Sequence, residues 1–313
     1  MRTPLNRLLN LADPPVLVLL YHRVTRLSSD PEMLAVTPEN FRAQMRHVKD
    51  NFSLVRFEED WTGAAKPAVA ITFDDGYADN ALEALPIIEE VGVPATFFVS
   101  TGSIGTVREF WWHELGRIIL EGDGLPARFN LSDSNLRKSW PTDSASERQR
   151  LYRDIVAIMT SADTRRRDSV LLQLRTWGGE HGRSGDGNRS LSVDELELLA
   201  ASSWVTIGAH TVTHTRLSSL SPEAQREEIT ASKRQLEQWL GRDISTFSYP
   251  FGRRPDYSNQ SIALCREAGF TRAAANFPGQ AHRWTDPYQI PRHLIRNWPT
   301  ETFAGKLQGF WTR

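Results

Sequence analysis

Two adjacent acidic residues, Asp74 and Asp75, stand directly after an apolar run that is typical of a buried strand, AVAITF at residues 68–73. Because Gly76 permits the backbone to turn at the strand end, both carboxylates can face one cleft. Two like charges this close raise the pKa of one carboxyl group unless a cation lies beside them, and a metal ion is the obvious candidate. The alternative is a solvated turn, or an N-cap for a helix that begins near Ala78.

A pair of histidines offers the remaining ligands that such an ion needs. His210 and His214 follow the apolar run at residues 204–209, and we expect one helical turn to place both imidazoles on the same side. Two imidazoles and one carboxylate are a usual ligand set for Zn²⁺ or a related divalent ion, with a position left for water. Alone, the pair would equally indicate a capped or surface helix. Together with the acidic pair, it predicts a metal site.

The stretches TFDDGY and HTVTH resemble the first two motifs of the polysaccharide deacetylases, carbohydrate esterase family 4 with its nodulation-type domain, in order and in placement at strand ends. The resemblance implies that Asp75, His210 and His214 hold a divalent metal, Zn²⁺ in the first place and Co²⁺ or Ni²⁺ as alternatives. It also implies that Asp74 is the general base. One acid then binds the metal, while the other stays ionised beside it and deprotonates a water molecule.

A third stretch, FSYPFGRR at residues 247–254, resembles the third motif of the family, in which an Arg, any residue and a Pro precede an aromatic residue. The resemblance assigns to the backbone N–H of Phe251 a part in binding the tetrahedral oxyanion. Ser248 stands where the family has the Arg that orients the base. The alternative interpretation of YPFG is a plain Pro-Gly turn.

The same departure occurs in a subgroup that includes the poly-N-acetylglucosamine deacetylases, in which an N-terminal YHxV segment accompanies YPFG. Residues 19–24, LLYHRV, match that segment, and the resemblance makes His22 the general acid. A strand-end histidine bonded to a carbonyl is the alternative. Arg292 matches a late Arg of the subgroup and is expected to replace the missing one. His293 is the competing acid, but neighbours on a strand point to opposite faces, so at most one of them reaches the metal.

The resemblance implies hydrolysis of an N-acetyl group on an amino sugar, in which Asp74 takes a proton from water and His22 gives one to the leaving amine. In the cytoplasm the substrate would be a nucleotide-linked or lipid-linked sugar, or a glycan precursor, in surface polysaccharide biosynthesis. Association with glycosyltransferase machinery is a further expectation.

Aromatic side chains are candidates for sugar contacts, because sugars lay their C–H faces on aromatic rings. The sequence has ten tryptophans, a high count, and the candidates among its aromatic residues are Trp111, Trp112, Trp284 and Tyr249. His293 is a further candidate. The alternative for each aromatic residue is packing in the core or between helices.

Apolar runs that are typical of strands alternate with helical stretches, at residues 16–21, 68–73, 95–100, 204–209, 245–249, 271–275 and 290–295. This alternation predicts a mostly parallel sheet wrapped by helices. Helix starts are marked at Thr37 and Ser221, each followed by Pro and Glu, and the second helix is expected to run to Leu240 and stop at Gly241. The resemblance implies an α/β fold, a distorted (β/α)7 barrel with its chemistry at the carboxyl ends of the strands.

An interval of about residues 103–192 separates two of these strands and is richer in helical pattern than a connection needs. We interpret it as a helical insertion in a single barrel domain of residues 1–313. Helices are expected near 145–160 and 163–176. The segment 178–190, rich in Gly, Ser and charge, is expected to be a mobile loop.

Composition disfavours several classes of function. The formal net charge of the 313-residue chain is -1, so no basic field exists to hold nucleic acid or an anionic membrane. The run at residues 16–20 is too short to span a bilayer, and Asp13, Pro14 and Pro15 interrupt any signal-peptide core. Cys265 is the only cysteine, which suits a reducing compartment. We therefore expect a cytoplasmic protein that does not span a membrane.

Two rival hypotheses use the same motifs. A non-catalytic carbohydrate-binding barrel could have lost turnover with the third-motif Arg, but it would not require both acids and both histidines. A deacylase for another small acyl amide, such as N-formyl, would use identical metal chemistry, and the size of the pocket alone would separate the two.

Overall fold

The structure is a computed structural model, which describes residues 10, 13–62, 64, 67–106, 109–133, 136–179 and 188–312. The chain divides into two compact units, the first formed by Met1–Ile104 with Leu191–Arg313 and the second by Gly105–Ser190. The second unit has nearly the bounds of the expected insertion at about 103–192. The expectation of a single domain with an insertion stays a prediction.

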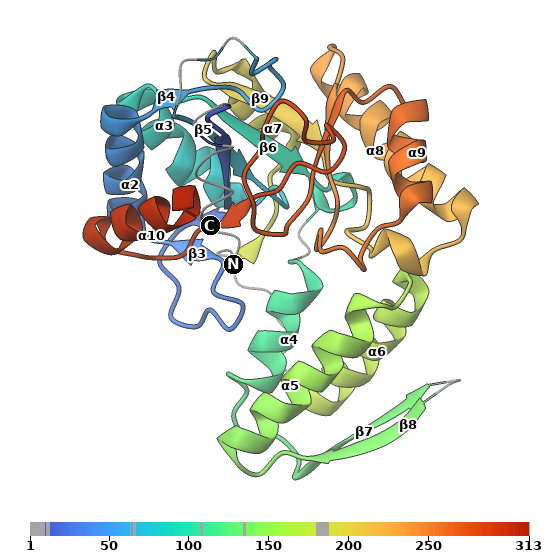
Figure 1. The fold of residues 1–313 in the computed structure, drawn as a ribbon. Coiled ribbons are helices and arrows are strands. Elements are labelled where there is room, and N and C mark those ends of the chain that lie inside the picture. Colours follow the sequence, from blue (N-terminus) through green and yellow to red (C-terminus); the bar gives the residue numbers. More distant parts are fainter. Residues whose placement is uncertain are drawn as a thin grey trace. The chain divides into compact units, whose positions relative to one another are not determined.

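The first unit is built on a curled sheet of parallel strands (Figure 1). The strands lie in the order β11, β10, β9, β6, β5, β1 and β12, and β4 pairs with the beginning of β5. Their bounds are β1 Val16–Tyr21, β4 Ser53–Leu54, β5 Ala68–Phe73, β6 Ala95–Val99, β9 Val205–Ala209, β10 Thr246–Ser248, β11 Arg272–Ala274 and β12 His293–Leu294. The seven expected strands are all present, and the barrel-type α/β fold is confirmed. A separate parallel pair is formed by β2 Arg23–Val24 and β3 Ala35–Val36.

Hydrogen bonds bring the two edges of this sheet together. The N–H of Ala275, just after β11, donates to the carbonyl of Ile290 at 2.9 Å, and the N–H of Ile290 donates to the carbonyl of Ala273 at 3.0 Å. Closer to β12, the N–H of Arg292 donates to the carbonyl of Phe277 at 3.1 Å. The segment that leads into β12 therefore links the two edges and curls the sheet.

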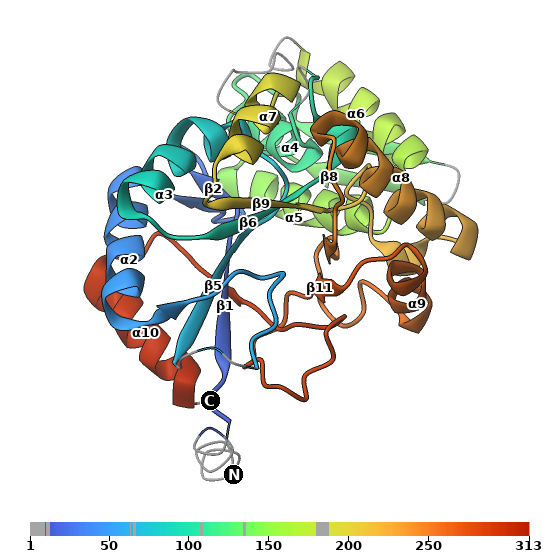
Figure 2. The same ribbon diagram turned by 90° about the horizontal axis from the view of Figure 1, so that it is seen from above.

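Helices of the first unit lie around the outside of the sheet (Figure 2). They are α2 Pro38–Asn51, α3 Leu85–Val91, α7 Val193–Ala201, α8 Pro222–Leu240, α9 Asn259–Glu267 and α10 Thr300–Thr312, with the short turns η1 Asn80–Ala84, η2 Thr101–Ser103 and η5 Leu217–Ser219. The predicted caps are confirmed: Thr37 accepts a hydrogen bond from the N–H of Asn40, and Ser221 accepts one from the N–H of Ala224. Gly241 ends α8 with a φ of 63°.

Alternation along the strands decides which side chains enter the barrel. One hydrophobic cluster packs between the sheet and the helices and contains the odd-numbered residues of β1, whereas Val16 and Val18 belong to a cluster inside the barrel that contains no helix residue. Strands β5, β6 and β11 divide in the same way, and the clustered residues of β9 and β10 are likewise odd-numbered. Even-numbered strand residues therefore face the interior.

The second unit has a hydrophobic core of its own, to which each α-helix and strand in its described residues contributes. It consists of α4 Trp111–Ile119, α5 Ala145–Thr160, α6 Thr164–Gly178 and a hairpin of β7 Arg128–Asp133 with β8 Leu136–Pro141. The helices expected near 145–160 and 163–176 are confirmed, but the hairpin was not expected. Most of the predicted mobile loop, residues 180–187, lies outside the described residues.

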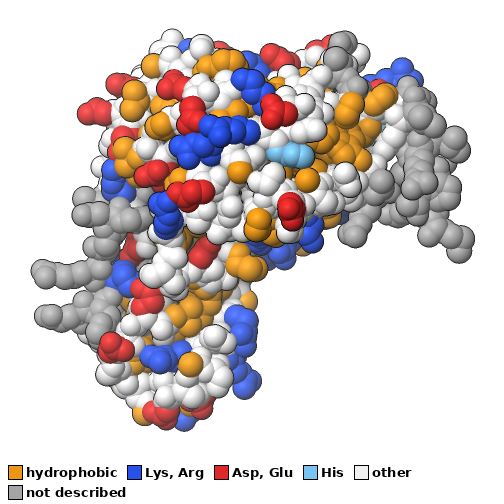
Figure 3. All heavy atoms as spheres, turned by 90° about the vertical axis from the view of Figure 1, so that its left-hand side faces the viewer, with side chains coloured by type: hydrophobic (Ala, Val, Ile, Leu, Met, Phe, Trp, Pro, Cys, Tyr) orange, Lys and Arg blue, Asp and Glu red, His pale blue; other side chains and the backbone are white. Residues whose placement is uncertain are grey.

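The surface agrees with a nearly neutral chain. On the face drawn in Figure 3, basic and acidic side chains are interspersed among the described atoms, without a large area of one sign. None of the helices in the described ranges is long and apolar enough to cross a membrane.

Candidate metal centre

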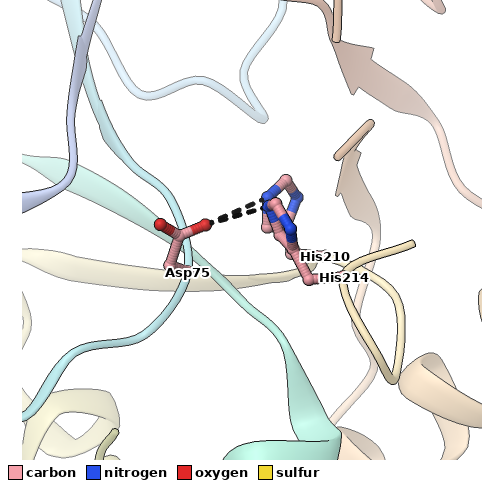
Figure 4. A group of neighbouring side chains, drawn as sticks. All are labelled: Asp75, His210 and His214. Carbon is pink, nitrogen blue, oxygen red and sulfur yellow. Dashed lines mark ion pairs between the residues drawn. The ribbon is translucent and has the colours of Figure 1, made fainter. Parts of the chain in front are cut away.

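The three predicted ligand residues converge just beyond the carboxyl ends of β5 and β9 (Figure 4). Nε2 of His214 lies 3.2 Å from Oδ1 of Asp75, and Nε2 of His210 lies 3.5 Å from the same oxygen. One ligand atom from each residue lies within 4.8 Å of the other two. All three side chains are buried. The structure therefore brings together residues that are up to 139 positions apart (214 minus 75) in the sequence.

The chemistry of these side chains fits a divalent cation. Nδ1 of His210 lies 2.7 Å from the carbonyl oxygen of Ser248. Because a carbonyl can only accept, Nδ1 carries a proton, and in the neutral imidazole Nε2 presents a lone pair. Oδ1 of Asp75 is buried, and no described residue offers it a hydrogen bond of good geometry. A cation among these atoms would relieve both groups, and Zn²⁺ accepts this combination of ligands.

Burial and the attraction of neighbouring groups act in opposite directions on the pKa of Asp75 and on that of His210, and the attraction prevails in both. Burial has the largest effect on Asp75 and raises its pKa, but the imidazoles of His210 and His214 outweigh burial and hold the pKa well below its ordinary value. Burial lowers the pKa of His210, whereas Asp74 and Asp75 raise it and prevail. In the protein alone, Arg292 matches the charge of Asp74, whereas the charge of Asp75 is matched by a protonated imidazole, and protonation removes a metal ligand.

The backbone at the centre adopts a conformation that is uncommon outside glycine. In the described part of the chain, positive φ values occur at five non-glycine residues, and four of these belong to the centre: Asp75 (80°), Thr211 (64°), His214 (51°) and Phe251 (61°). At Asp75 this bend turns an odd-numbered side chain into the barrel. Gly76 continues the bend at 88°, and a Cβ there would lie 3.0 Å from Cγ1 of Val99.

The turn between the two histidines differs from the helical turn that their spacing suggested. Residues 210–214 form no helix. Glu228 of α8 instead accepts hydrogen bonds from the N–H groups of Val212 and Thr213, both at 2.9 Å. The prediction of a helical turn was wrong because the two groups that would close such a turn bond elsewhere. The N–H of His214 donates to the hydroxyl of Thr211 at 3.1 Å, and the carbonyl of His210 accepts from the hydroxyl of Ser100 at 2.9 Å.

Asp74 lies beside the three ligands and is held by Arg292. The guanidinium donates to both carboxylate oxygens, each at 2.7 Å. The hydroxyl of Ser248 accepts from Arg292 at 2.9 Å and donates to Asp74 at 3.2 Å. The guanidinium that the third motif lacks at position 248 is therefore supplied in space by Arg292. Burial raises the pKa of Asp74, but Arg292 and His210 outweigh it and hold the pKa below its ordinary value.

The two candidate acids lie on opposite faces of the sheet. His22 directly follows β1, close enough to the acidic pair for both carboxylates to raise its pKa, although burial is the larger effect and the pKa is lowered overall. The ring of His293 faces the helices and stacks on Phe310 of α10, with 3.9 Å between ring centroids. Burial lowers the pKa of His293 to about 4. Of the two neighbouring residues at the start of β12, Arg292 just before the strand and His293 on it, Arg292 alone enters the barrel.

Two aromatic residues of the third stretch, Tyr249 and Phe251, lie in different surroundings. The ring of Phe251 packs against the ring of His214, with 4.9 Å between centroids, so Phe251 borders the metal centre. Tyr249 faces the helices instead. Its ring stacks on Tyr257 at 4.1 Å, and its hydroxyl donates to the carbonyl of Tyr288 at 3.1 Å. This position is that of a packing residue.

Within the first unit, none of the candidate tryptophans lies beside the three ligand residues. Trp284 belongs to that unit but lies elsewhere, and the other two belong to the second unit. Trp284 is 52% exposed and stacks on His282, with 4.6 Å between centroids. His282 lines a cavity with Val16 and Arg272, which begin β1 and β11, so Trp284 lies at the opposite end of the sheet from the metal centre. Trp111 and Trp112 belong to α4 of the second unit and pack edge to face, 5.2 Å apart.

Sequence analysis missed several residues that hold the site. Glu228 is one of several acids on α8, and no signal in the sequence distinguishes it. Asp79 and Asn80 contact the residues after β1, and their only signal is their proximity to the acidic pair. Ser248 was noted as a missing Arg, whereas its even number on β10 predicts that its hydroxyl enters the barrel.

Comparison with families of known proteins gives one match that covers the centre. The model of the family described as polysaccharide deacetylase matches residues 62–125 and 174–273. The matched segments contain the acidic pair, both histidines and the third stretch, but neither His22 nor Arg292. The residues between the segments, 126–173, all belong to the second unit.

Individual proteins show a similar relation. The chain is 22% identical to the Bacillus subtilis (strain 168) protein named "Putative polysaccharide deacetylase YxkH" over 282 residues, which cover 88% of this chain and 69% of that protein. It resembles the Streptococcus pyogenes deacetylase PplD in complex with acetate (17% identity, TM-score 0.59, 94% of this chain and 98% of that one). It also resembles IcaB from Ammonifex degensii (16% identity, TM-score 0.59, 96% and 98%). At these identities, the structural likeness shows a shared fold.

Proposed function

The chain belongs to the polysaccharide deacetylase family, and we propose that it is a metal-dependent hydrolase that removes an N-acetyl group from an amino sugar. The observation that carries the proposal is the convergence of Asp75, His210 and His214 beside Asp74, whose carboxylate is held by a buried guanidinium. Metal ligands and a general base in one buried cluster are the parts that metal-assisted hydrolysis of an amide requires.

Asp75, His210 and His214 would hold the ion, which we propose to be Zn²⁺, with Co²⁺ and Ni²⁺ as alternatives that accept the same ligands. When bound, such an ion polarises the acetyl carbonyl and lowers the pKa of a water molecule. The hydrogen bond from His210 to the carbonyl of Ser248 supports this role, because it directs Nε2 toward the position of the ion.

Asp74 would accept the proton of the attacking water. Arg292 and Ser248 donate to its two oxygens, and because each carboxylate oxygen has two lone pairs, room remains for the proton. The paired hydrogen bonds from Arg292 fix the plane of the carboxylate and keep it ionised, as a base requires.

His22 would protonate the leaving nitrogen, and the N–H of Phe251 would donate to the oxyanion. An amide nitrogen leaves poorly until it is protonated, so the reaction needs an acid. Burial lowers the pKa of His22, so its protonated form gives up a proton more readily than an exposed imidazolium does. The contact between the rings of Phe251 and His214 supports the assignment of Phe251 to the site.

The substrate that we propose is a nucleotide-linked or lipid-linked amino sugar, or a glycan precursor, in surface polysaccharide biosynthesis. Membership of the polysaccharide deacetylase family supports a carbohydrate substrate. A glycosyltransferase partner and a cytoplasmic location are further proposals that rest on the sequence alone.

An acetate-release screen tests the proposed function. The full chain is stripped with a chelator, reloaded with Zn²⁺, Co²⁺ or Ni²⁺, and incubated with UDP-N-acetylglucosamine, a polyprenyl-diphosphate-linked N-acetylglucosamine and N-acetylglucosamine oligomers. We expect one ion per chain, and acetate from at least one of these sugars only when the ion is present. Formate released from N-formyl analogues alone would favour the other deacylase. A chain that binds the ion and sugar but releases neither acid would favour the carbohydrate-binding barrel and contradict the proposal.

A further inference from the structure

The helix that follows the acidic pair contains a turn of an uncommon kind. Residues Asn80–Ala84 form the π-helical turn η1, in which the N–H of Leu85 donates to the carbonyl of Asn80, five residues earlier. Such turns are rare and lie frequently at functional sites. Asn80, the first residue of the turn, and Asp79 before it are buried, although both side chains are polar. Their contacts explain why polar side chains are placed there.

Asp79 and Asn80 hold three consecutive residues of the segment that follows β1. Nδ2 of Asn80 donates to the carbonyl of His22 at 2.9 Å. The two carboxylate oxygens of Asp79 accept from the N–H of Val24 and from Nε of Arg23, both at 2.9 Å. The backbone on which His22 stands is therefore tied to the start of the helix that follows Asp74 and Asp75.

The ring of His22 depends on this anchor more than the ring of His210 does. Nδ1 of His210 is oriented by the carbonyl of Ser248 at 2.7 Å, whereas Nδ1 of His22 is buried and has no hydrogen-bond partner among the described residues. With no such bond at Nδ1, the position of the imidazole is set by its own peptide. That peptide is the group that Asn80 holds.

Asn80 is also an unfavourable choice for packing alone. Its side chain is fully buried, and its Oδ1 finds no hydrogen-bond donor in the described ranges. A leucine of similar shape would avoid leaving that oxygen unsatisfied. Nδ2 donates to the carbonyl of His22 at 2.9 Å and, more weakly, to Oδ1 of Asp79 at 3.4 Å, and both acceptors belong to the anchor of the segment after β1, which accounts for the amide.

We infer that Asn80 is a positioning residue, which fixes the peptide of His22 so that the imidazole can protonate the leaving nitrogen. The inference rests on the proposed function, and within it on His22 as the acid. Residues 74–80 then carry the base at one end and the anchor of the acid at the other. The distance between proton acceptor and proton donor is thereby set by one short, buried stretch of chain.

Rates on substrates with different leaving groups distinguish a variant whose general acid is misplaced from a variant whose whole site is damaged. 4-Nitrophenolate leaves 4-nitrophenyl acetate without needing a proton, whereas the alkoxide of 2,2,2-trifluoroethyl acetate and the amine of an N-acetyl sugar are helped by one. In the zinc-loaded full chain, we expect Asn80→Leu to lose about tenfold to a hundredfold in kcat/KM on trifluoroethyl acetate and on N-acetylglucosamine oligomers. The loss on 4-nitrophenyl acetate should stay below about twofold, since the metal ligands and base are unchanged. Asn80→Ala provides a second variant should Asn80→Leu not fold.

Gln225→Met is the matched control. Gln225 is another buried amide, and its Nε2 donates to the carbonyl of Leu220 at 3.1 Å, but it lies on α8 and contacts Ser261 of α9. For Gln225→Met, the ratio of kcat/KM on trifluoroethyl acetate to kcat/KM on 4-nitrophenyl acetate should equal that of the wild type. Because Asn80 acts through His22, the double variant His22→Gln/Asn80→Leu should be no slower than His22→Gln alone.

The possible outcomes separate this inference from the proposed function. Equal losses of Asn80→Leu on both esters, or losses that multiply in the double variant, would overturn the positioning role and leave the proposed function intact. A zinc-loaded wild type that hydrolyses neither the esters nor any N-acetyl sugar of the acetate-release screen would overturn the proposed function, and the inference with it.

Discussion

Asp74 and Asp75 are neighbours in the sequence, yet the protein stabilises their charges by different means. Asp74 has a permanent counter-ion, the buried guanidinium of Arg292, with two hydrogen bonds of 2.7 Å. Among the described residues, Asp75 forms its ion pairs with the imidazoles of His210 and His214, at 3.5 and 3.2 Å. A carboxylate with a built-in cation is suited to accept a proton from water, and one without is suited to bind a cation from solution. Two like charges can therefore share one strand end because each has its own source of positive charge.

The largest effect is expected from Asp75→Asn, which removes the negative charge on the side without a permanent cation. The ion content should fall well below one per chain. Acetate release should fall by about a thousandfold or more, because several kcal/mol of transition-state stabilisation depend on the ion. Metal analysis and the acetate assay measure the two effects. His293→Gln changes a buried histidine on the outer face of β12 and should keep both ion and activity. Normal turnover by Asp75→Asn without an ion would break the comparison.

Asp74→Asn should have the next largest effect and a different pattern. We expect the variant to keep its ion and to lose about a hundredfold in kcat, because the base is gone while the ligands remain. The charge of Arg292 is then buried without its partner, so the free energy of unfolding should fall by about 3 kcal/mol. Rates are therefore compared at a temperature where circular dichroism shows both proteins folded. Loss of the ion would mean that the two carboxylates do not have separate tasks.

Arg292→Gln removes the permanent cation and leaves both carboxylates in place. Without the guanidinium, burial dominates and the pKa of Asp74 rises. A base must be ionised to act, so the acidic limb of the pH–rate profile should move to higher pH. At neutral pH we expect a loss of about tenfold, with a smaller loss for Arg292→Lys, which keeps the charge but not the paired hydrogen bonds. An acidic limb that stays in place would remove Arg292 from this role.

The smallest effect is expected from Glu228→Gln, which weakens the support of the turn that carries His214. An amide oxygen accepts the two backbone hydrogen bonds less strongly than a carboxylate does. The affinity for Zn²⁺ should fall by about tenfold, with little change of rate at saturating metal. Competition with a chelating dye measures the affinity. Glu227→Gln is the control, since the neighbouring side chain is 73% exposed and pairs with Arg234 at 3.7 Å. Equal affinities for the two variants would show that the turn holds its shape without Glu228.

The sequence predicted the strands and the group of ligands because both depend on local pattern and residue type. The sequence also indicates which side chains face the interior, through the alternation along each strand. His22, Asp74, His210, Ser248 and Arg292 are all even-numbered, and even-numbered strand residues face the barrel interior. The same alternation places the odd-numbered Tyr249 and His293 on the outer face of the sheet, against the helices.

Other features could not be predicted because they depend on contacts between distant parts of the chain. The turn at residues 211–214 takes its shape from Glu228 on another element. Asn80 and His22 are 58 residues apart in the sequence, and no periodicity relates them. The structure places Trp284 at the end of the sheet opposite the metal centre, and the sequence does not indicate at which end of a barrel a tryptophan lies.

The alternation along β12 has a consequence for how this site can change during evolution. Removing a single residue from the strand would exchange the two faces, so that the imidazole of His293 would enter the barrel and the guanidinium of Arg292 would be pressed against Phe310. Insertions and deletions should therefore accumulate in the connecting segments. Within the strands they should be rare, because a shift of one residue would reverse which side chains face the interior.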